Sequence, residues 1–255
     1  MSIFWEIHQD LPREGPGDNA FTRKAFEMIT GLPPQPRILD IGCGPGMQTI
    51  ELALISNGRI TAVDNHQPFL DVLSQRTQAA GLSGRIETLN QSMFSLDFPK
   101  NGFDLIWSEG AIYIMGFRKG LCEWREFLKP HGYIAVSECS WLKRNPPEDL
   151  KGFWDTAYPG MVSIEENSRI IQDCGYSEMG HFVLPESAWW QDYYDPLIQR
   201  VKMLREKYAG DPEAQGELDN ELEEIEIYRK YHEYYGYVFY VMQRTPVIDT
   251  VTCPQ

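Results

Sequence analysis

The sequence has few basic residues and no long apolar run. Lys and Arg total 23 against 37 Asp and Glu, which gives a formal net charge of -14. Because such a surface repels phosphate backbones and anionic membranes, we expect no nucleic-acid and no membrane partner. No 18 apolar residues run together, so no transmembrane helix is expected. The amino terminus lacks a basic start and a long apolar core, which predicts a cytoplasmic protein without a secretion signal.

The chain also has few cysteines for its 255 residues. The five cysteines are widely spaced and form no C-x-x-C pair, so neither a zinc site nor a disulfide framework is expected. A chain of this length can bury the core of one α/β domain without cross-links. Four histidines lack metal-ligand spacing, so we expect them neither to bind a metal nor to take part in chemistry: His8, His131, His181 and His232.

A glycine-rich turn follows the first strand-like run. The stretch ILDIGCGPG, residues 38–46, predicts a buried strand that turns sharply into a helix, where bare backbone lets a ligand approach closely. Eighteen residues after Gly46, a second apolar run ends at Asp64. A carboxylate at the carboxyl end of the neighbouring strand can accept hydrogen bonds from both ribose hydroxyls. The pair therefore predicts a nucleoside site.

The glycine spacing indicates which nucleoside. Gly42, Gly44 and Gly46 give G-x-G-x-G, whereas a dinucleotide fingerprint is G-x-G-x-x-G. With Asp40 two residues before the first glycine, the stretch closely resembles motif I of the class I S-adenosyl-L-methionine (SAM) dependent methyltransferases. The resemblance is firmest over residues 37–139 and implies SAM as cofactor, with S-adenosyl-L-homocysteine as product. The patterns SEGAIY and VSECSW look most like bacterial small-molecule methyltransferases of the ubiquinone and menaquinone biosynthesis type.

The resemblance also implies the cofactor contacts. Asp40 is expected to orient the methionyl amino end, the three glycines to allow close backbone approach, and Asp64 to bind the ribose. Gln91 stands where relatives usually carry an acid near the adenine amino group, which leaves that contact open. The other residues expected to line the cofactor site are Cys43, Asn65, Ser92, Met93 and Ser108.

The acceptor end of the site is less sharply defined. Methyl transfer from a sulfonium depends mainly on positioning and on exclusion of water, so a general base is optional. Glu109 and Glu138 are the tentative candidates for one, although each could instead be a solvated rim carboxylate. Four aromatic residues are expected either to wall the acceptor pocket or to lie in the core: Tyr113, Trp141, Trp154 and Tyr158.

The expected acceptor is a small molecule. The fourth strand is not followed by the [DN]-P-P-[YF] motif of methyltransferases that modify exocyclic or amide nitrogens, which disfavours DNA adenine and protein glutamine. Together with the acidic composition, this predicts a small, uncharged or cationic acceptor. A SAM-binding sensor or partner subunit without catalysis is the alternative. An NAD(P)-dependent oxidoreductase is disfavoured by the glycine spacing.

The expected fold class is α/β. From Arg37, strand-like runs alternate with helical patterns, which predicts a doubly wound, mostly parallel, Rossmann-like sheet. The resemblance implies seven strands, the last antiparallel at 237–244, in a single methyltransferase domain of residues 1–245. Residues 1–36 are expected either to cover a sheet edge or, through the loop at 15–17, to form a lid over the cofactor. Residues 141–160 look irregular, and 246–255 are expected to be a flexible tail.

A helical insertion is expected between the last two strands, at residues 186–236. Apolar residues at helical spacing predict two amphipathic helices, with eight acids between Asp211 and Glu226 on the outer face of the second. The insertion is expected to pack against the sheet. Homodimerisation and a substrate cap are the alternatives.

Overall fold

The sheet has the expected seven strands. The computed structural model describes residues 3–246 and places the strands in the order β3-β2-β1-β4-β5-β7-β6. The pairings among β1 to β5 are parallel, whereas β7 runs antiparallel to both β5 and β6. The predicted fold class is therefore confirmed. The strands are β1 Arg37–Ile41, β2 Arg59–Asp64, β3 Ile86–Asn90, β4 Phe103–Glu109, β5 Leu128–Trp141, β6 Tyr176–Val183 and β7 Tyr235–Arg244.

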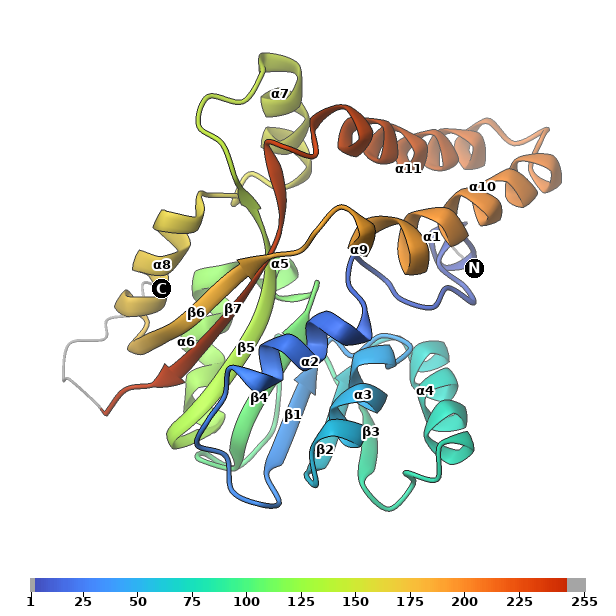
Figure 1. Ribbon diagram of the computed structural model, residues 1–255. Helices are drawn as coiled ribbons and strands as arrows, with labels where there is room; N and C mark the ends of the chain where they lie inside the picture. Colours follow the sequence, from blue (N-terminus) through green and yellow to red (C-terminus); the bar gives the residue numbers. More distant parts are fainter. Residues whose placement is uncertain (1–2, 247–255) are drawn as a thin grey trace.

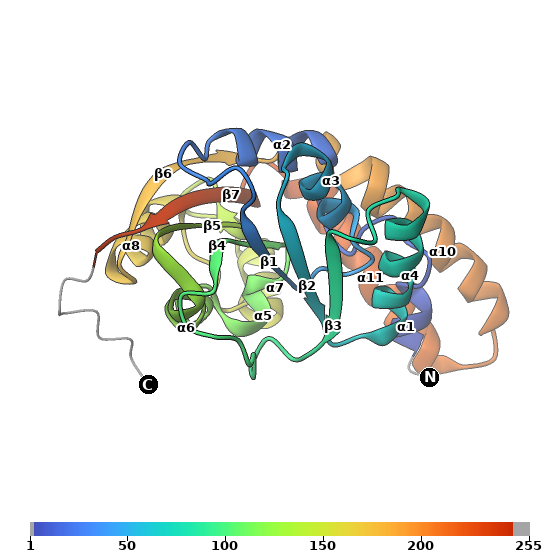
Figure 2. The same ribbon diagram turned by 90° about the horizontal axis from the view of Figure 1, so that it is seen from below.

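Helices cover both faces of this sheet (Figures 1 and 2). One core cluster joins the sheet to α2, α3 and α4, and a second joins its other face to α5, α6 and α8. The helices are α1 Ile3–Ile7, α2 Asn19–Glu27, α3 Met47–Ile55, α4 Gln67–Ala79, α5 Ile112–Met115, α6 Phe117–Trp124, α7 Glu148–Ala157, α8 Ile164–Asp173, α9 Ser187–Trp189, α10 Asp195–Lys207 and α11 Pro212–Tyr231, with a 3-10 turn η1 Arg125–Phe127 and a π-helical turn η2 Trp190–Tyr194.

The strand register brings the ends of three strands together. Asp40 in β1 lies opposite Ala62 in β2 and Trp107 in β4. Since the three strands are parallel, their carboxyl ends meet at one edge of the sheet, where ligands bind in open α/β folds. The glycine turn, Asp64 and Glu109 follow directly at that edge.

The amino-terminal helix and the insertion form one cap beside this edge. Helix α1 contacts both α10 and α11, and the three lie together in Figure 1. Arg200 in α10 donates from Nε to the Glu6 carbonyl at 2.8 Å, and the Tyr208 hydroxyl donates to the Glu6 carboxylate at 2.6 Å. The two predicted amphipathic helices of the insertion are present as α10 and α11.

Several local expectations need correction. The segment expected to be irregular contains the ten-residue helix α7, and the amino terminus adds the helix α1. Helix α2 packs against α3 and β7, and its Lys24 lies over the ring of Phe182 in the edge strand β6 at 4.0 Å, as expected for a helix that covers a sheet edge. Cys43, Cys139 and Cys174 carry free thiols, but Cys122 is disulfide-bonded, which the cysteine spacing did not indicate. Residues 247–255 of the expected tail lie outside the described residues.

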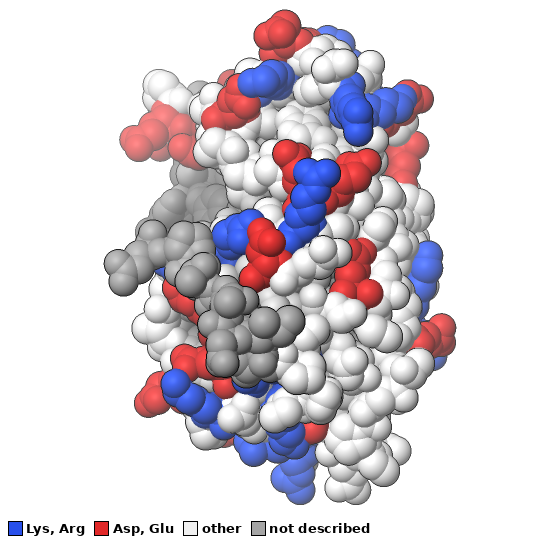
Figure 3. All heavy atoms as spheres, turned by 90° about the vertical axis from the view of Figure 1, so that its left-hand side faces the viewer, with Lys and Arg blue, Asp and Glu red and all other residues white. Residues whose placement is uncertain are grey.

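Surface charge is mixed on the face drawn in Figure 3. Basic and acidic side chains are interspersed there, with wide uncharged areas between them. Within residues 3–246, no helix is both long enough and apolar enough to cross a bilayer.

Candidate active site

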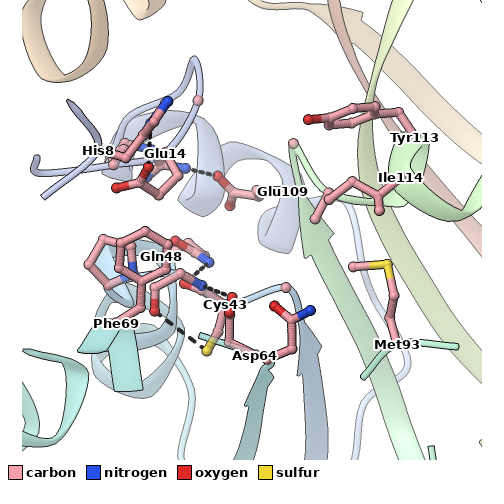
Figure 4. A pocket seen from close by; sticks show the side chains of 18 of the residues that line it. His8, Glu14, Cys43, Gln48, Asp64, Phe69, Met93, Glu109, Tyr113 and Ile114 are labelled. Carbon is pink, nitrogen blue, oxygen red and sulfur yellow. Dashed lines mark hydrogen bonds and ion pairs between the residues drawn. The ribbon is translucent and has the colours of Figure 1, made fainter. Parts of the chain in front are cut away.

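A cavity of about 430 Å³ lies at the carboxyl ends of β1, β2 and β4. Its walls come from the glycine turn, the strand ends, the amino-terminal segment and the insertion. In Figure 4, His8 and Glu14 lie across the cavity from Tyr113 and Ile114, with Asp64 below them. The cavity therefore joins segments that are far apart in the sequence.

The glycine turn is built without room for side chains. Gly42 and Gly46 have φ values of +71° and +82°, and a Cβ on Gly46 would lie 2.2 Å from Leu73 Cδ1. Gly42 and Cys43 both donate their backbone N–H to the Val63 carbonyl, at 2.8 and 3.0 Å. These bonds fix the turn against the end of β2, next to Asp64.

Asp64 is held in place by backbone amides. Its two carboxylate oxygens accept the N–H groups of Gly44 and His66, each at 2.9 Å. Burial raises the pKa of Asp64, and these amide bonds oppose that rise. The His66 ring stacks on Trp5 of α1 with centroids 3.7 Å apart, so the amino-terminal helix covers this corner. Asp64 thus presents a fixed acceptor to the cavity.

Asp40 lies behind the turn and is fully buried. Its Oδ2 accepts a hydrogen bond from the Thr49 hydroxyl at 2.6 Å, and burial raises its pKa to about 7. It does not line the cavity, so any contact with the methionyl end is indirect. Gln48, which lines the cavity, donates to the Cys43 carbonyl at 2.9 Å.

The predicted cofactor residues fall into two groups. Those that line the cavity are Gly42, Cys43, Gly44, Asp64, Asn65, Gln91 and Met93. Those that lie behind or beside it are Asp40, Gly46, Ser92 and Ser108. Ser108 donates to the Ile41 carbonyl at 2.9 Å and so ties β4 to β1. The Cys43 thiol is buried, and burial raises its pKa well above the ordinary value, so it is not a thiolate nucleophile.

Glu109 lines the cavity but its carboxylate is already occupied. Oε1 accepts from the Thr22 hydroxyl at 2.6 Å and from Trp107 Nε1 at 2.9 Å, and Oε2 is paired with Arg13. A carboxylate with both oxygens engaged by donors is poorly placed to take a proton from an acceptor. The contacts favour an anchoring role for Glu109.

Three of the four predicted acceptor aromatics do not line the cavity. Tyr113 lines it, and the Tyr158 ring lies edge-on to Tyr113 with centroids 5.7 Å apart. Trp154 packs edge-on against Tyr235 at 4.9 Å, and Trp141 donates to the Met161 carbonyl at 3.1 Å. The two tryptophans therefore belong to the packing around the end of β5, α7 and the start of β7.

Glu138 is 1% exposed and lies outside the cavity lining. Burial raises its pKa to about 8, although the Tyr158 hydroxyl donates to Oε1 at 2.5 Å.

The raised pKa of Glu138 predicts a stability that depends on pH. In the unfolded chain the pKa of Glu138 is near 4.5, so the contribution of the neutral carboxyl group to stability is complete below pH 4.5 and declines up to about pH 8. We expect the stability of the wild type relative to Glu138→Gln to fall over this range, by at most about 1.4 kcal/mol per pH unit. Urea unfolding at pH 5, 6.5 and 8 measures it, and a constant difference would contradict it.

The insertion supplies a second set of carboxylates. Glu221 and Glu224 of α11 line the cavity, so these two acids do not lie on the outer face of the helix as the charge pattern predicted. Leu218, three residues before Glu221, is fully buried, which shows that this face turns inward. The Tyr194 hydroxyl donates to Glu224 at 2.9 Å. Burial, and then the neighbouring Glu221, raises the pKa of Glu224 to about 7.

His8 connects the amino-terminal segment to the insertion. Its Nδ1 lies 2.8 Å from Glu14 and its Nε2 lies 3.6 Å from Glu221. Burial lowers the pKa of His8, but bonding to the two carboxylates outweighs burial and raises the pKa to about 9. His8 is therefore a cation at neutral pH. The sequence did not indicate a role for His8, because it lacks metal-ligand spacing and its partners come from distant elements.

The sequence reasoning missed most of the cap residues at the cavity. These are Phe4, Trp5, His8, Arg13, Glu14, Tyr193, Glu221 and Glu224. For Glu221 a signal was available, since it follows Leu218 and precedes Ile225 at helical spacing on one face. Gly15 and Pro16 of the proposed lid loop do line the cavity. Within residues 3–246, no group of three or more metal-ligating side chains is placed to hold an ion.

Part of the chain is similar to known methyltransferases. Residues 38–132 match the family model described as a methyltransferase domain. The sterol 24-C-methyltransferase erg-4 of Neurospora crassa is 24% identical over 185 residues, 69% of this chain and 48% of that protein. Phosphoethanolamine N-methyltransferase 1 of Arabidopsis thaliana is 21% identical over 191 residues, 74% of this chain and 38% of that protein. The chain thus spans about half the length, or less, of these curated relatives.

Among solved structures, a SAM-dependent methyltransferase from Geobacter sulfurreducens in complex with S-adenosyl-L-homocysteine has the same fold. The two structures superpose with a TM-score of 0.79 at 20% sequence identity, and the superposition covers 95% of this chain and 97% of that one. The chain therefore has the fold of class I SAM-dependent methyltransferase structures, and its residues 38–132 are similar to a methyltransferase domain.

Proposed function

We propose that this protein transfers a methyl group from SAM to a small-molecule acceptor. The observation that carries the proposal is the fixed Asp64 carboxylate beside a glycine turn that is open to the cavity. A ribose diol requires an acceptor of this kind at the end of β2, and close approach of the rest of the nucleoside requires bare backbone at the end of β1. Asn65, Gln91 and Met93 lie beside Asp64 and would surround the adenine.

The chain's part in the reaction is positioning. SAM supplies a methyl group already activated by its sulfonium, so the protein needs to align the acceptor and exclude water. Within the cap, helices α1 and α11 contribute side chains to the wall of the cavity. Glu224, whose pKa is about 7, is the cavity carboxyl group best suited to accept a proton from an acceptor that must lose one.

The charges in the cavity favour an uncharged or cationic acceptor. Two basic side chains, Arg13 and His8, line it together with five acidic ones, namely Glu14, Asp64, Glu109, Glu221 and Glu224. Both basic groups already contact carboxylates. An acceptor phosphate would thus meet net negative charge. The ubiquinone and menaquinone type of acceptor, and the homodimer, stay predictions.

The exposed apolar side chains of the cavity lining favour an acceptor with an apolar part. Four lining side chains are large, hydrophobic and exposed: Phe4, Phe94, Tyr113 and Ile114, at 44%, 54%, 40% and 52%. Exposed apolar side chains that line a cavity are suited to contact an apolar part of a ligand. We therefore infer an acceptor whose reactive atom enters the cavity while its apolar part contacts these side chains.

Calorimetric titration with S-adenosyl-L-homocysteine, with NADH as the control ligand, tests the cofactor. Micromolar binding of S-adenosyl-L-homocysteine alone is the expected result. Binding of NADH alone would identify an oxidoreductase and overturn the proposal.

Turnover is tested separately by release of S-adenosyl-L-homocysteine with paired acceptors, for example an alkyl amine and its phosphorylated counterpart. We expect the uncharged or cationic member of a pair to be preferred. Cofactor binding without turnover across a broad panel would favour the sensor alternative.

A further inference from the structure

A second cavity, of about 210 Å³, lies at the edge of the sheet opposite to the candidate active site. Its lining comes from the amino ends of β1, β2, β3 and β4 and from the turn that precedes β3. Parallel strands begin at one edge of a sheet and end at the other, so the two cavities lie at opposite ends of the same strands. In Figure 1, these amino ends lie away from α10 and α11.

Three arginines stand side by side in this lining, and each is followed by an isoleucine: Arg37, Arg59 and Arg85. Arg37 of β1 pairs in register with Arg59 of β2. Because the residues that follow Arg59 and Arg85 are paired between β2 and β3, these two arginines are neighbours as well. Neighbouring strands lie about 4.8 Å apart, and like charges at opposite positions repel each other. We call these three residues the arginine row.

No acid neutralises the arginine row. Among residues 3–246, every ion pair of an arginine involves an arginine outside the row. Glu87 is the one acidic residue in the lining, and it forms no ion pair within the described residues. Asp104 accepts the Arg37 backbone N–H at 2.8 Å, but its carboxylate is paired with Lys129. The lining is therefore locally positive in a chain with a formal net charge of -14.

Two of the three guanidinium groups are positioned by the fold. Arg85 donates from Nε to the Gly58 carbonyl at 3.1 Å and from Nη2 to the Ser56 carbonyl at 2.5 Å, whereas its Nη1 makes no hydrogen bond within the described part of the chain. The guanidinium carbon of Arg37 lies 5.4 Å from the centroid of the Phe103 ring. Side chains that are already positioned lose less conformational entropy when a ligand binds.

The same lining offers uncharged donors. The hydroxyls of Thr61 and Ser83, and the backbone N–H groups of Ser83 and Gly84, make no hydrogen bond within residues 3–246. A Cβ on Gly84 would meet no atom within 4 Å, so this turn is open to a ligand. Guanidinium, hydroxyl and backbone N–H groups together are suited to bind phosphate oxygens.

We propose that this cavity binds a small polyphosphate anion. Arg37 and Arg59 contact one phosphate group, and Arg59 and Arg85 contact the next. The bound anion removes the repulsion within the arginine row. The inference goes beyond the proposed function and does not depend on it, since the two cavities share no lining residue.

Titration calorimetry with inorganic pyrophosphate at constant ionic strength tests the site. We expect the wild type to bind one pyrophosphate per chain. In the double variant Arg37→Gln/Arg59→Gln, the affinity should fall tenfold or more, because charge-assisted hydrogen bonds to phosphate oxygens are lost. The double variant Arg144→Gln/Arg169→Gln removes two exposed arginines outside the cavity and changes the net charge equally, so it should stay within about twofold of wild type. No binding to the wild type, or equal losses in both double variants, would overturn the proposal.

S-Adenosyl-L-homocysteine tells the two cavities apart. At saturation it should leave the affinity for pyrophosphate unchanged. Displacement of pyrophosphate would place the anion in the first cavity and would overturn the proposal. Failure of S-adenosyl-L-homocysteine to bind would count against the proposed function and not against the arginine row.

A measurement on the unaltered protein covers the case in which Arg37→Gln/Arg59→Gln does not fold. Phenylglyoxal modifies arginine side chains, and peptide mass spectrometry gives the rate at each one. Pyrophosphate should slow the modification of Arg37 and Arg59 several-fold and leave Arg144 and Arg169 unchanged, and unchanged rates at all four would contradict the site. Uridine diphosphate, tested in the same way, distinguishes an inorganic ligand from a phosphorylated organic one, since only the latter gains contacts from the rest of the molecule.

Discussion

Replacing Asp64 with alanine should lower the affinity for S-adenosyl-L-homocysteine about a hundredfold or more. A hydrogen bond to a charged group is worth about 1.5–3 kcal/mol, and the ribose diol would lose two of them. A loss of about 3 kcal/mol corresponds to roughly a hundredfold in Kd. The amides of Gly44 and His66 would also lose their acceptor, which loosens the glycine turn and adds to the effect. Calorimetric titration of the variant measures the change.

Two further variants make this result specific. Asp64→Asn keeps one acceptor oxygen and should give an intermediate affinity. Asp71→Ala removes an acid on α4 that bonds only with Gln67 among the hydrogen bonds of the described residues, and it should bind like the wild type. Thermal unfolding run in parallel shows whether Asp64→Ala still folds. A folded Asp64→Ala protein with unchanged affinity would remove the basis of the proposed cofactor site.

Replacing Trp189 with alanine should destabilise the protein by about 3–5 kcal/mol, the usual cost of removing a buried large aromatic side chain. Trp189 is 2% exposed at the start of the insertion. Its ring stacks on Tyr228 of α11 with centroids 4.0 Å apart and meets Tyr235 of β7 at 6.2 Å. One side chain thus joins the cap to the sheet. Chemical unfolding gives the loss in free energy of unfolding.

The neighbouring tryptophan provides a matched control. Trp190 is only half-buried and stacks under Arg229, so Trp190→Ala should cost clearly less. If the insertion unfolds separately when Trp189 is lost, unfolding will show two transitions, and acceptor turnover will fall more than cofactor affinity. Equal, small losses for both variants would mean that the cap is held chiefly by other contacts.

The parts of this protein that could be predicted from the sequence are those encoded by local pattern. A run of buried β-branched and aliphatic residues followed by closely spaced glycines specifies a strand, a turn and a helix start, because each step depends on neighbouring residues only. The regular alternation of such units then predicts a parallel sheet, whose carboxyl ends hold the ligand site. Asp40, the glycine turn, Asp64 and the sheet follow from this reasoning. The capping box at Ser163 and Glu166 is present for the same reason.

The cap was beyond that reasoning because it depends on contacts between distant segments. The acids of α11 looked like a solvated face, yet Glu221 and Glu224 turn inward because α1 and the loop at Arg13 lie against that side of the helix. Ion pairs with Glu14 and Glu221 keep His8 protonated. Arg13 is buried because it pairs with Glu109 and packs closely against Gly17. No local pattern records which face another segment will cover. The sequence by itself therefore determined the sheet and the glycine turn beside Asp64, and the tertiary structure alone decided which charged side chains surround the cavity, because these come from segments that are distant in the sequence.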